Sequence, residues 1–364
     1  MTTETVAAEP TETPVYPSLS PSRAADFKTC PLLYRFRTID RLPERPSADQ
    51  LRGTLVHAVL ERLFDLPAAE RTSASAAGLV GPEWERLVAD HPDLVELFAD
   101  GVSDPDAPAG AEALPGPWPA PVEVTPVEVV TVVGEPAPDA VEAAAMEAAA
   151  PTLPGPWPAP VVVERPKWTL ADFLEAARVL VDGYFAVEDP SRLEPAERES
   201  LISAIVDDQL LIRGYIDRLD VSPEGALRVV DYKTGGAPRE AFEARALFQL
   251  KFYALVLWRT RGVVPRVLRL LYLKDQEVLD YSPDADELAR FERTIVALWR
   301  AIDQATQAKE FRPKPSRLCG WCAHQALCPA FGGTPPPFPD PPAPRPADAL
   351  AAAGVVEPPG ADEE

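Results

Sequence analysis

Two aspartates and a lysine stand close together in a stretch of sequence that is typical of a β-hairpin. Asp217 and Asp231 lie on either side of Ser222-Pro-Glu-Gly225, a strong turn signal, and Lys233 follows two residues after Asp231. Paired residues in a hairpin have a constant sum of residue numbers, so this turn places Asp217 opposite Asp231 to within one residue. Directly opposed side chains have Cβ atoms roughly 5 Å apart. The pattern therefore predicts two carboxylates that face each other.

Two facing carboxylates repel each other unless a cation lies between them. Carboxylate oxygens suit Mg²⁺ or Mn²⁺, so the pair predicts a divalent metal site. Lys233 shares a strand face with Asp231, and its ammonium group could orient a water molecule or stabilise charge that develops on an attacked phosphate. The alternative is a surface hairpin with a solvated Asp-Lys pair. Apolar residues flank both aspartates and place the strands in a core, which favours a functional site.

A histidine and two further polar residues lie on helices before and after the hairpin. His57 follows a Gly-x-x-x spacer and shares a helical face with Glu61, so an ordinary His-Glu pair is the alternative to a metal ligand. Gln249 and Tyr253 have the same spacing and could reach a phosphate or a base edge from one face. An ordinary amphipathic helix would carry these two residues as well.

In their order along the chain, these motifs resemble those of the RecB-like and AddB-like nucleases of the PD-(D/E)XK superfamily. They are Gly-x-x-x-His57, Gly-Tyr-Ile-Asp217-Arg, Asp231-Tyr-Lys233-Thr-Gly and Gln249-x-x-x-Tyr253. The resemblance covers about residues 18–100 and 167–330. It implies an α/β (α+β) fold with a restriction-endonuclease-like core, in which helices flank a central mixed sheet.

The resemblance also implies a role for each motif residue. His57, Asp217 and Asp231 would bind the divalent metal, with the carbonyl oxygen of Tyr232 as a further ligand. The metal would polarise the scissile phosphate and lower the pKa of a bound water. Lys233 would be the catalytic lysine.

The implied activity is hydrolysis of DNA, as an exonuclease on single strands or DNA ends, in repair or recombination. Gln249 and Tyr253 would contact the DNA, and Glu197 or Glu199 is a further candidate before the hairpin. No P-loop motif occurs, so ATP-driven unwinding would need a helicase partner in trans. The alternative is a catalytically silent DNA-binding or scaffold subunit, against which the intact acidic and lysine motifs argue.

All four cysteines of the chain fit one site. Cys319-Gly-Trp-Cys322 is followed by Cys328-Pro329, and Cys30, also followed by proline, lies far upstream. Four thiolates suit either a [4Fe–4S] cluster or a tetrahedral Zn²⁺, and the spacing does not separate them. The resemblance implies a [4Fe–4S] cluster, because AddB-like nucleases carry one cysteine before and three after the nuclease motifs. Closing so long a loop would remove unfolded-state entropy worth about 5 kcal/mol, which favours a structural role over redox sensing.

Hydrophobic periodicity and cap residues predict the elements that position these side chains. Helices are expected over residues 20–37, 48–64, 84–98, 168–187, 239–261 and 285–307. Strands are expected over residues 207–220, 226–233 and 267–274, and a cysteine-bearing loop over residues 313–329.

Composition divides the chain into folded and low-complexity parts. Residues 18–100 and 166–332 are expected to form the nuclease domain, and residues 1–17, 101–165 and 333–364 to be disordered because they are acidic and mostly Pro-rich. These three stretches carry −3, −9 and −5 of a net charge of −22. The folded part is therefore only mildly acidic, which is compatible with a local basic DNA groove.

The stretch from residue 101 to 165 contains one internal duplication. Leu114-Pro-Gly-Pro-Trp-Pro-Ala-Pro-Val122 recurs at residues 153–161, either as a docking segment for a partner or as a duplicated linker. No apolar run reaches the roughly 18 residues of a membrane span, and the N-terminus lacks the pattern of a signal peptide. A cytoplasmic protein that does not contact membranes is expected, and the oligomeric state stays open.

Overall fold

The computed structural model describes residues 17–44, 46–98, 102–103, 167–237 and 243–339. The N-terminal tail, most of the Pro-rich insert with its duplicated motif, and the C-terminal tail from residue 340 lie outside the described residues. The short strands β2 (Val102–Ser103) and β3 (Lys167–Trp168) pair with each other, so the chain leaves and re-enters the described part at neighbouring positions.

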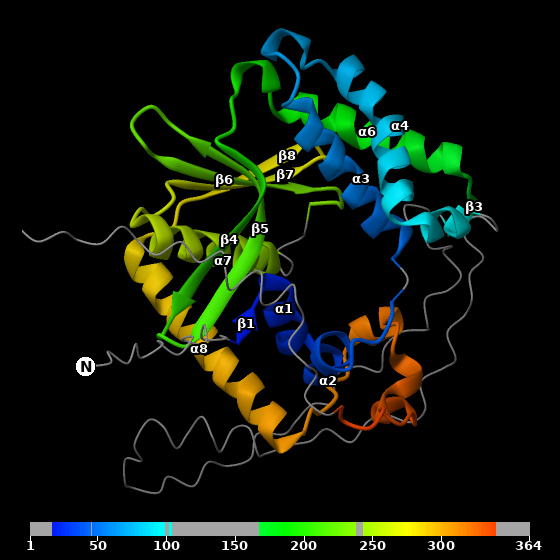
Figure 1. The fold of residues 1–364 in the computed structure, drawn as a ribbon, viewed down its shortest axis with the longest axis vertical. Helices are drawn as coiled ribbons and strands as arrows, with labels where there is room; N and C mark the ends of the chain where they lie inside the picture. Colours follow the sequence, from blue (N-terminus) through cyan, green and yellow to red (C-terminus); the bar gives the residue numbers. More distant parts are fainter. Residues whose placement is uncertain (1–16, 45, 99–101, 104–166, 238–242, 340–364) are drawn as a thin grey trace, which may run out of the picture. The chain divides into compact units, whose positions relative to one another are not determined.

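The centre of the fold is a six-stranded mixed sheet (Figure 1). Its strands are β1 (Ser18–Leu19), β4 (Glu197–Val206), β5 (Leu210–Val221), β6 (Leu227–Lys233), β7 (Val267–Tyr272) and β8 (Glu277–Tyr281). The order across the sheet is β1-β5-β6-β7-β8, and β4 pairs with β5. β1 with β5 and β6 with β7 are parallel, whereas the other pairs are antiparallel. The fold class is thus the mixed α/β class that was expected.

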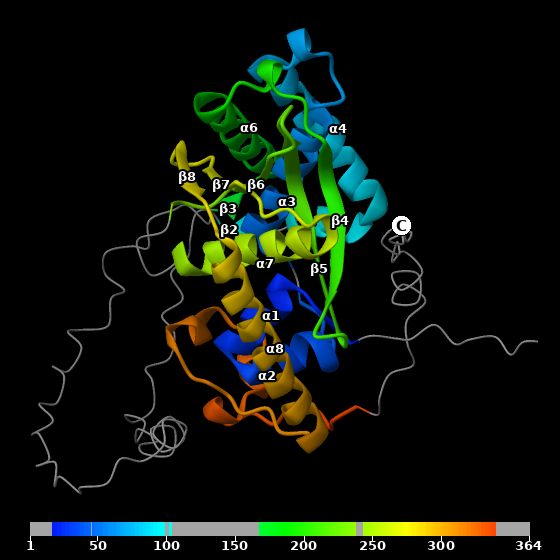
Figure 2. The ribbon, with the colours of Figure 1, turned by 90° about the vertical axis from the view of Figure 1, so that its left-hand side faces the viewer.

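Helices cover both faces of this sheet, as the two perpendicular views show (Figures 1 and 2). They are α1 (Pro21–Thr29), α2 (Pro31–Tyr34), α3 (Ala48–Leu63), α4 (Ser73–Asp90), α6 (Leu170–Val187), α7 (Glu243–Arg261) and α8 (Ala285–Ala308). One apolar core joins α3, α4 and α6 to one face of β6 and β7. A second core joins α1, α2, α7 and α8 to the opposite face.

Strand alternation assigns the residues of β6 to these two cores. Val230 and Tyr232 belong to the core under α3, α4 and α6, whereas Val229 belongs to the core under α7 and α8. Asp231 and Lys233 alternate with Tyr232 and therefore lie on the α7 side of the sheet.

The N-terminal helical segment differs from the single helix expected over residues 20–37. The helix breaks at Cys30, whose backbone is extended with φ −160° and ψ 115°, and the chain continues through α2 into a π-helical turn at Arg35–Ile39. The break follows from Pro31, which lacks an amide proton and disfavours the helical conformation in the residue before it. As a result, Cys30 lies in a bend between two helices.

Other element boundaries also differ from expectation. The helix expected from residue 84 begins at Ser73, where Thr72 caps it. The strand expected from residue 207 begins at Leu210, because Asp207 and Asp208 form a turn with positive φ. Strands β4 and β8 were not predicted, and β4 matters because it contributes to the candidate site.

Candidate active site

His57 points from α3 toward the end of β6, where three acceptors surround its ring. Its Nε2 lies 3.0 Å from the carbonyl oxygen of Tyr232, and its Nδ1 lies 3.4 Å from Glu199 Oε1 and 3.6 Å from Asp217 Oδ2. Burial alone would lower the pKa of His57, but the carboxylates of Asp217, Glu199 and Asp231 raise it to about 9. The imidazolium therefore supplies a positive charge at a point where acidic groups converge.

Glu199 reaches the same point from β4 through an unusual backbone conformation. In the β4–β5 ladder Arg198 pairs with Arg218 and Ser200 pairs with Ile216, while Glu199 itself has φ 42°. A left-handed conformation is unfavourable for a residue with a Cβ and persists where the surroundings impose it, often at functional sites. Of the two glutamates considered from the sequence, Glu199 is the one beside His57.

The other glutamate has a different partner. Glu197 forms an ion pair with Arg261 at the end of α7. Its side chain therefore contacts α7, and no contact with His57 is found among the described residues.

Asp217 and Asp231 lie together at the junction of β5 and β6. The predicted hairpin register is confirmed, since Arg218 pairs with Val230 and Leu219 with Val229. The paired ladder ends at Arg218, and Asp217 and Asp231 are the next residues beyond it on the two strands. Both side chains are buried, with Asp217 9% and Asp231 1% exposed. Burial, followed by the charge of Asp231, raises the pKa of Asp217 to about 7.

Lys233 joins Asp231 to two polar residues of α7. Its Nζ lies 2.6 Å from Asp231 Oδ2 and donates to Gln249 Oε1 over 3.0 Å, and Gln249 Nε2 donates to the hydroxyl of Tyr253 over 2.8 Å. Burial opposes the charge of Lys233, but Asp231 outweighs it and raises the pKa of the lysine. Gly214 leaves room for the side chain of Tyr253, because a Cβ at position 214 would lie 2.7 Å from Tyr253 Cε1.

The donor set fits a divalent cation. His57, Glu199 and Asp217 each offer one ligand atom, and these atoms lie within 4.8 Å of one another. Beside them, Asp231 Oδ2 is buried and accepts no hydrogen bond of good geometry, although it lies at ion-pair distance from Lys233. One imidazole nitrogen with several carboxylate oxygens is a set that Mg²⁺ or Mn²⁺ accepts. The resemblance implied His57, Asp217 and Asp231 as ligands, with Glu197 or Glu199 as a further candidate. The structure places Glu199 together with His57 and Asp217.

A buried ion-pair network lies behind the site, on the other face of the sheet. Arg218 is fully buried and donates from Nη1 to Glu188 Oε2 at 2.6 Å, to the Tyr232 hydroxyl at 3.0 Å and to the Tyr184 hydroxyl at 3.3 Å. Its Nη2 also donates to Asp220. This network holds the side chain of Tyr232, whose backbone contacts both His57 and Asp217.

Glu199 was one of two candidates from the sequence, whereas no role was predicted for Arg218. Glu199 stands in a segment that continues with alternating apolar residues, which is a strand signal that was not used. Arg218 directly follows Asp217 in the motif, but its burial and its partner Glu188, which lies 30 residues earlier, depend on the tertiary structure.

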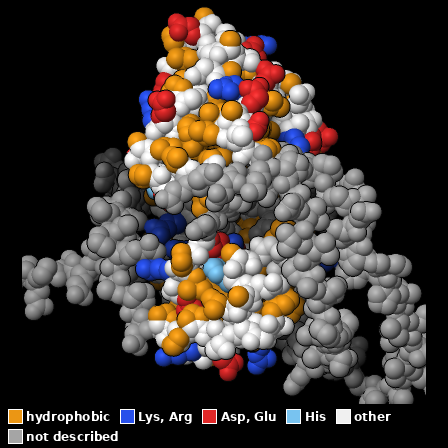
Figure 3. All heavy atoms as spheres, turned by 90° about the vertical axis from the view of Figure 1, so that its right-hand side faces the viewer, with side chains coloured by type: hydrophobic (Ala, Val, Ile, Leu, Met, Phe, Trp, Pro, Cys, Tyr) orange, Lys and Arg blue, Asp and Glu red, His pale blue; other side chains and the backbone are white. Residues whose placement is uncertain are grey.

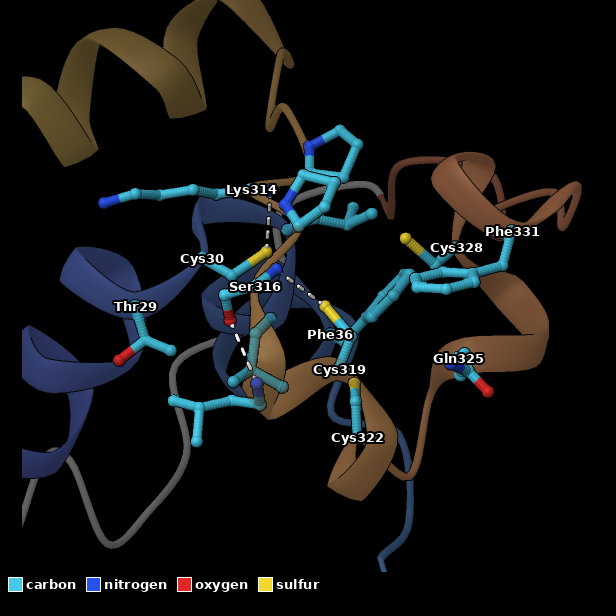
Figure 4. A pocket seen from close by; sticks show the side chains of 15 residues that line it. Thr29, Cys30, Phe36, Lys314, Ser316, Cys319, Cys322, Gln325, Cys328 and Phe331 are labelled. Atoms are coloured by element: carbon cyan, nitrogen blue, oxygen red, sulfur yellow. Dashed lines mark hydrogen bonds between the residues drawn. The ribbon is translucent and has the colours of Figure 1, made fainter. Parts of the chain in front are cut away.

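The four cysteines line a single pocket between the N-terminal helices and the C-terminal loop. Figure 4 shows Cys30, Cys319, Cys322 and Cys328 pointing into it. Backbone amides reach two of the sulfur atoms, from Lys314 to Cys30 Sγ and from Ser316 to Cys319 Sγ, both over 3.3 Å.

Burial and the neighbouring sulfur atoms affect two of these thiols. Burial raises the pKa values of Cys322 and Cys328, and the charges of the other cysteines add to the effect. The chain thus brings its four thiols to one place, as the sequence predicted, and the pKa values of two of them are raised there.

The surface of the described residues does not carry a single sign of charge. On the face drawn in Figure 3, acidic and basic side chains are intermixed with apolar ones. Among the described helices, none has both the length and the apolar character that crossing a bilayer requires.

The fold and the site define a nuclease of one known class. A family model described as the PD-(D/E)XK nuclease superfamily matches residues 18–114 and 129–329. The chain therefore belongs to the PD-(D/E)XK nuclease superfamily, and the match spans the helices, strands and cysteine-bearing loop described above.

Two curated relatives share part of this chain. They are the Gene 69 proteins of Mycobacterium phages L5 and D29, each 32% identical over 127 residues, or 34% of the chain. These matches cover 41% and 45% of the relatives' own lengths. A crystal structure from Eubacterium rectale, described as a candidate exonuclease, matches 84% of the chain and 87% of its own, with 10% identity and a TM-score of 0.42.

Proposed function

We propose that this chain hydrolyses phosphodiester bonds in DNA with the help of Mg²⁺ or Mn²⁺. The observation that carries the proposal is the group formed by His57, Glu199 and Asp217 beside the ion pair of Asp231 and Lys233. When bound, the metal would polarise the scissile phosphate and lower the pKa of a bound water.

The protein residues around the metal have separate tasks. His57, Asp217, Asp231 and Glu199 would hold the ion, and the protonated amine of Lys233 would stabilise negative charge on the attacked phosphate. The hydrogen bond from Lys233 to Gln249 fixes the position of the amine. Partly enclosed charges of this kind act more strongly than they would in water.

The finer assignment is a RecB-like or AddB-like exonuclease that acts on single strands or DNA ends in repair or recombination. In this assignment Gln249 and Tyr253 contact the DNA, a helicase partner acts in trans, and the protein works in the cytoplasm. The order and spacing of the motifs support the assignment. The hydrogen bond between Gln249 and Tyr253 supports it as well, because it presents both polar ends next to Lys233.

The cysteine pocket is proposed to hold a structural [4Fe–4S] cluster. Tetrahedral Zn²⁺, with Zn–S bonds of about 2.3 Å, would hold the sulfur atoms roughly 3.8 Å apart. The resemblance to AddB-like nucleases, with one cysteine before and three after the nuclease motifs, favours the cluster over zinc. In a [4Fe–4S] cluster each cysteine binds a different iron, which suits wider spacing. Anaerobic purification should give a brown protein with iron and acid-labile sulfide, whereas a colourless protein with one zinc would contradict the cluster.

A nuclease assay tests the catalytic proposal. The parent protein and Asp231→Ala are incubated with Mn²⁺ and end-labelled single- and double-stranded DNA, and DNA binding is measured in parallel without metal. We expect cleavage by the parent and its loss in Asp231→Ala with binding retained. If the parent binds DNA but cuts none of the substrates, the chain is a silent scaffold subunit.

A further inference from the structure

One large aromatic side chain stands out on the surface of the cysteine-bearing loop. Trp321 is 78% exposed, more than any other exposed large apolar residue among those described, and Leu318 and Phe331 from the same loop are also exposed. Scattered exposed apolar residues are common, but a tryptophan with apolar neighbours on one short segment is typical of an interaction site.

The loop presents Trp321 on a fixed backbone. The residue ends a short 3-10 turn, Arg317–Trp321, which is capped by Ser316. Its neighbours Cys319 and Cys322 line the cysteine pocket. Because the backbone is held on both sides, a partner that stacks on the indole orders few additional bonds, which favours binding.

The same loop is basic within an acidic chain. Residues 309–333 carry four basic residues and one acidic residue, whereas the whole chain has a net charge of −22. Arg312, which precedes the pocket, is 90% exposed, and its nearest carboxylate is 3.8 Å away. A basic loop with an exposed aromatic residue is complementary to a polyanion that also offers flat apolar groups.

Lys314, which lines the cysteine pocket, contacts a second lysine, Lys28 of α1. Lys314 Nζ donates to the carbonyl oxygen of Lys28 over 3.2 Å, and no ion pair to either lysine is found among the described residues. Two lysines in contact, with no carboxylate paired to either among the described residues, favour the binding of an anion at this place.

Lys28 also lies against α7, the helix that carries Gln249. The ammonium of Lys28 stands 4.1 Å from the ring centroid of Phe248 in α7, and Phe248 directly precedes Gln249, the partner of Lys233. Lys28 therefore contacts the same helix, α7, that carries Gln249 of the acidic site.

We infer that Trp321, Lys314 and Lys28 form a binding surface for unpaired DNA, with a base stacked on Trp321 and phosphates bound by the two lysines. The inference rests on the proposed nuclease function and adds the place where the strand is held before it reaches the acidic site. An unpaired base is required, because the bases inside a duplex have no free face for stacking.

Binding is measured with the full-length Asp231→Asn protein, its cysteine site loaded, in EDTA so that no cleavage occurs. The probe is a fluorescein-labelled oligo-dT, and the duplex reference is a blunt-ended DNA hairpin whose loop is a non-nucleotide linker, so that it has no unpaired base. Trp321→Ala should weaken oligo-dT binding roughly 5- to 100-fold and leave hairpin binding unchanged. Val179→Ala, which truncates another exposed apolar side chain on α6, should have no effect.

The lysines are tested through the salt dependence of binding. The double variant Lys28→Gln/Lys314→Gln should reduce the slope of log affinity against log salt by about 1.4, which corresponds to two phosphate contacts on a single strand. The Lys28→Arg/Lys314→Arg variant should retain the parental slope.

The outcome also separates this surface from the catalytic proposal. If Trp321→Ala binds oligo-dT as tightly as the parent, or loses hairpin binding to the same extent, the surface does not bind unpaired DNA and a protein partner is its remaining occupant. Because these measurements need no divalent metal, they are independent of whether the chain cuts DNA.

Discussion

The backbone amide of Tyr232 donates a hydrogen bond to Asp217 Oδ2 over 2.7 Å. On the other side of the same residue, the carbonyl oxygen lies 3.0 Å from His57 Nε2. The backbone of Tyr232 therefore joins two side chains of the candidate metal site. Its side chain points to the opposite face of the sheet, where Arg218 binds the hydroxyl.

This arrangement makes the Tyr232 hydroxyl a positioning group. Tyr232→Phe removes the acceptor of Arg218 without opening a cavity, and the strand between Asp231 and Lys233 loses one anchor. We expect Mn²⁺ affinity or the cleavage rate to fall by about tenfold, the lower end of what comparable outer-shell contacts contribute. Mn²⁺ binding is measured by electron paramagnetic resonance, and cleavage in a separate assay.

Tyr184→Phe is the matched control for this substitution. Tyr184 accepts a hydrogen bond from the same guanidinium and its ring packs against that of Tyr232, but its backbone belongs to α6 and not to the motif strand. Tyr232→Phe removes one hydrogen bond and should cost about 1 kcal/mol of stability. Tyr184→Phe removes two, one from Arg218 and one to Glu188, and should cost about 2 kcal/mol. Only Tyr232→Phe should alter metal binding, and equal Mn²⁺ affinities in the two variants would show that the anchor does not position the site.

The positive φ of Glu199 predicts that two substitutions with the same effect on metal binding will differ in stability. Glu199→Gly and Glu199→Ala both remove the carboxylate beside His57, so both should weaken Mn²⁺ binding. Only glycine adopts φ 42° without a steric cost, so Glu199→Gly should be more stable than Glu199→Ala by about 1 kcal/mol. Denaturant unfolding measures the difference, and equal stabilities would mean that the backbone relaxes in the alanine variant.

Metal binding should strengthen as the pH rises. In the metal-free chain, burial and Asp231 raise the pKa of Asp217 to about 7, while nearby carboxylates overcome burial and raise that of His57 to about 9. A cation binds the ionised carboxylate and the neutral imidazole, so it competes with both protons. Calorimetry in buffers of different ionisation enthalpy should detect proton release on Mn²⁺ binding at pH 7. Affinity that does not change between about pH 6 and 9 would be inconsistent with these shifts.

Gly183 allows α6 to approach the backbone of Leu273 closely. A Cβ at Gly183 would lie 2.2 Å from the carbonyl oxygen of Leu273, whereas a Cβ at Gly78 in α4 would meet nothing within 4 Å. Gly183→Ala should therefore destabilise the fold by about 1–3 kcal/mol. Gly78→Ala should stabilise it by about 0.5–1 kcal/mol, because alanine favours the helix. Thermal unfolding measures the stability of both variants against the parent. If Gly183→Ala is as stable as the parent, α6 can shift away from Leu273.

Much of the hairpin was predictable because its contacts are local. The turn between residues 222 and 225 sets the register, and the pairing of Arg218 with Val230 confirms it. Similarly, Ser47 and Thr169 cap α3 and α6, whose ends lie within two residues of the predicted ones. The break at Cys30 was encoded by Pro31 but was overridden in our prediction by the apolar periodicity around it.

The sequence by itself determined which residue types can bind a cation and which acids face each other across the turn, because neighbours along a hairpin meet wherever the rest of the chain goes. Only the tertiary structure decided that Glu199, 142 residues from His57, completes the group, and that Arg218 is buried against Glu188. Those choices depend on which helix packs on which face of the sheet. Packing is set by the summed burial of distant apolar side chains, and a motif does not contain that information.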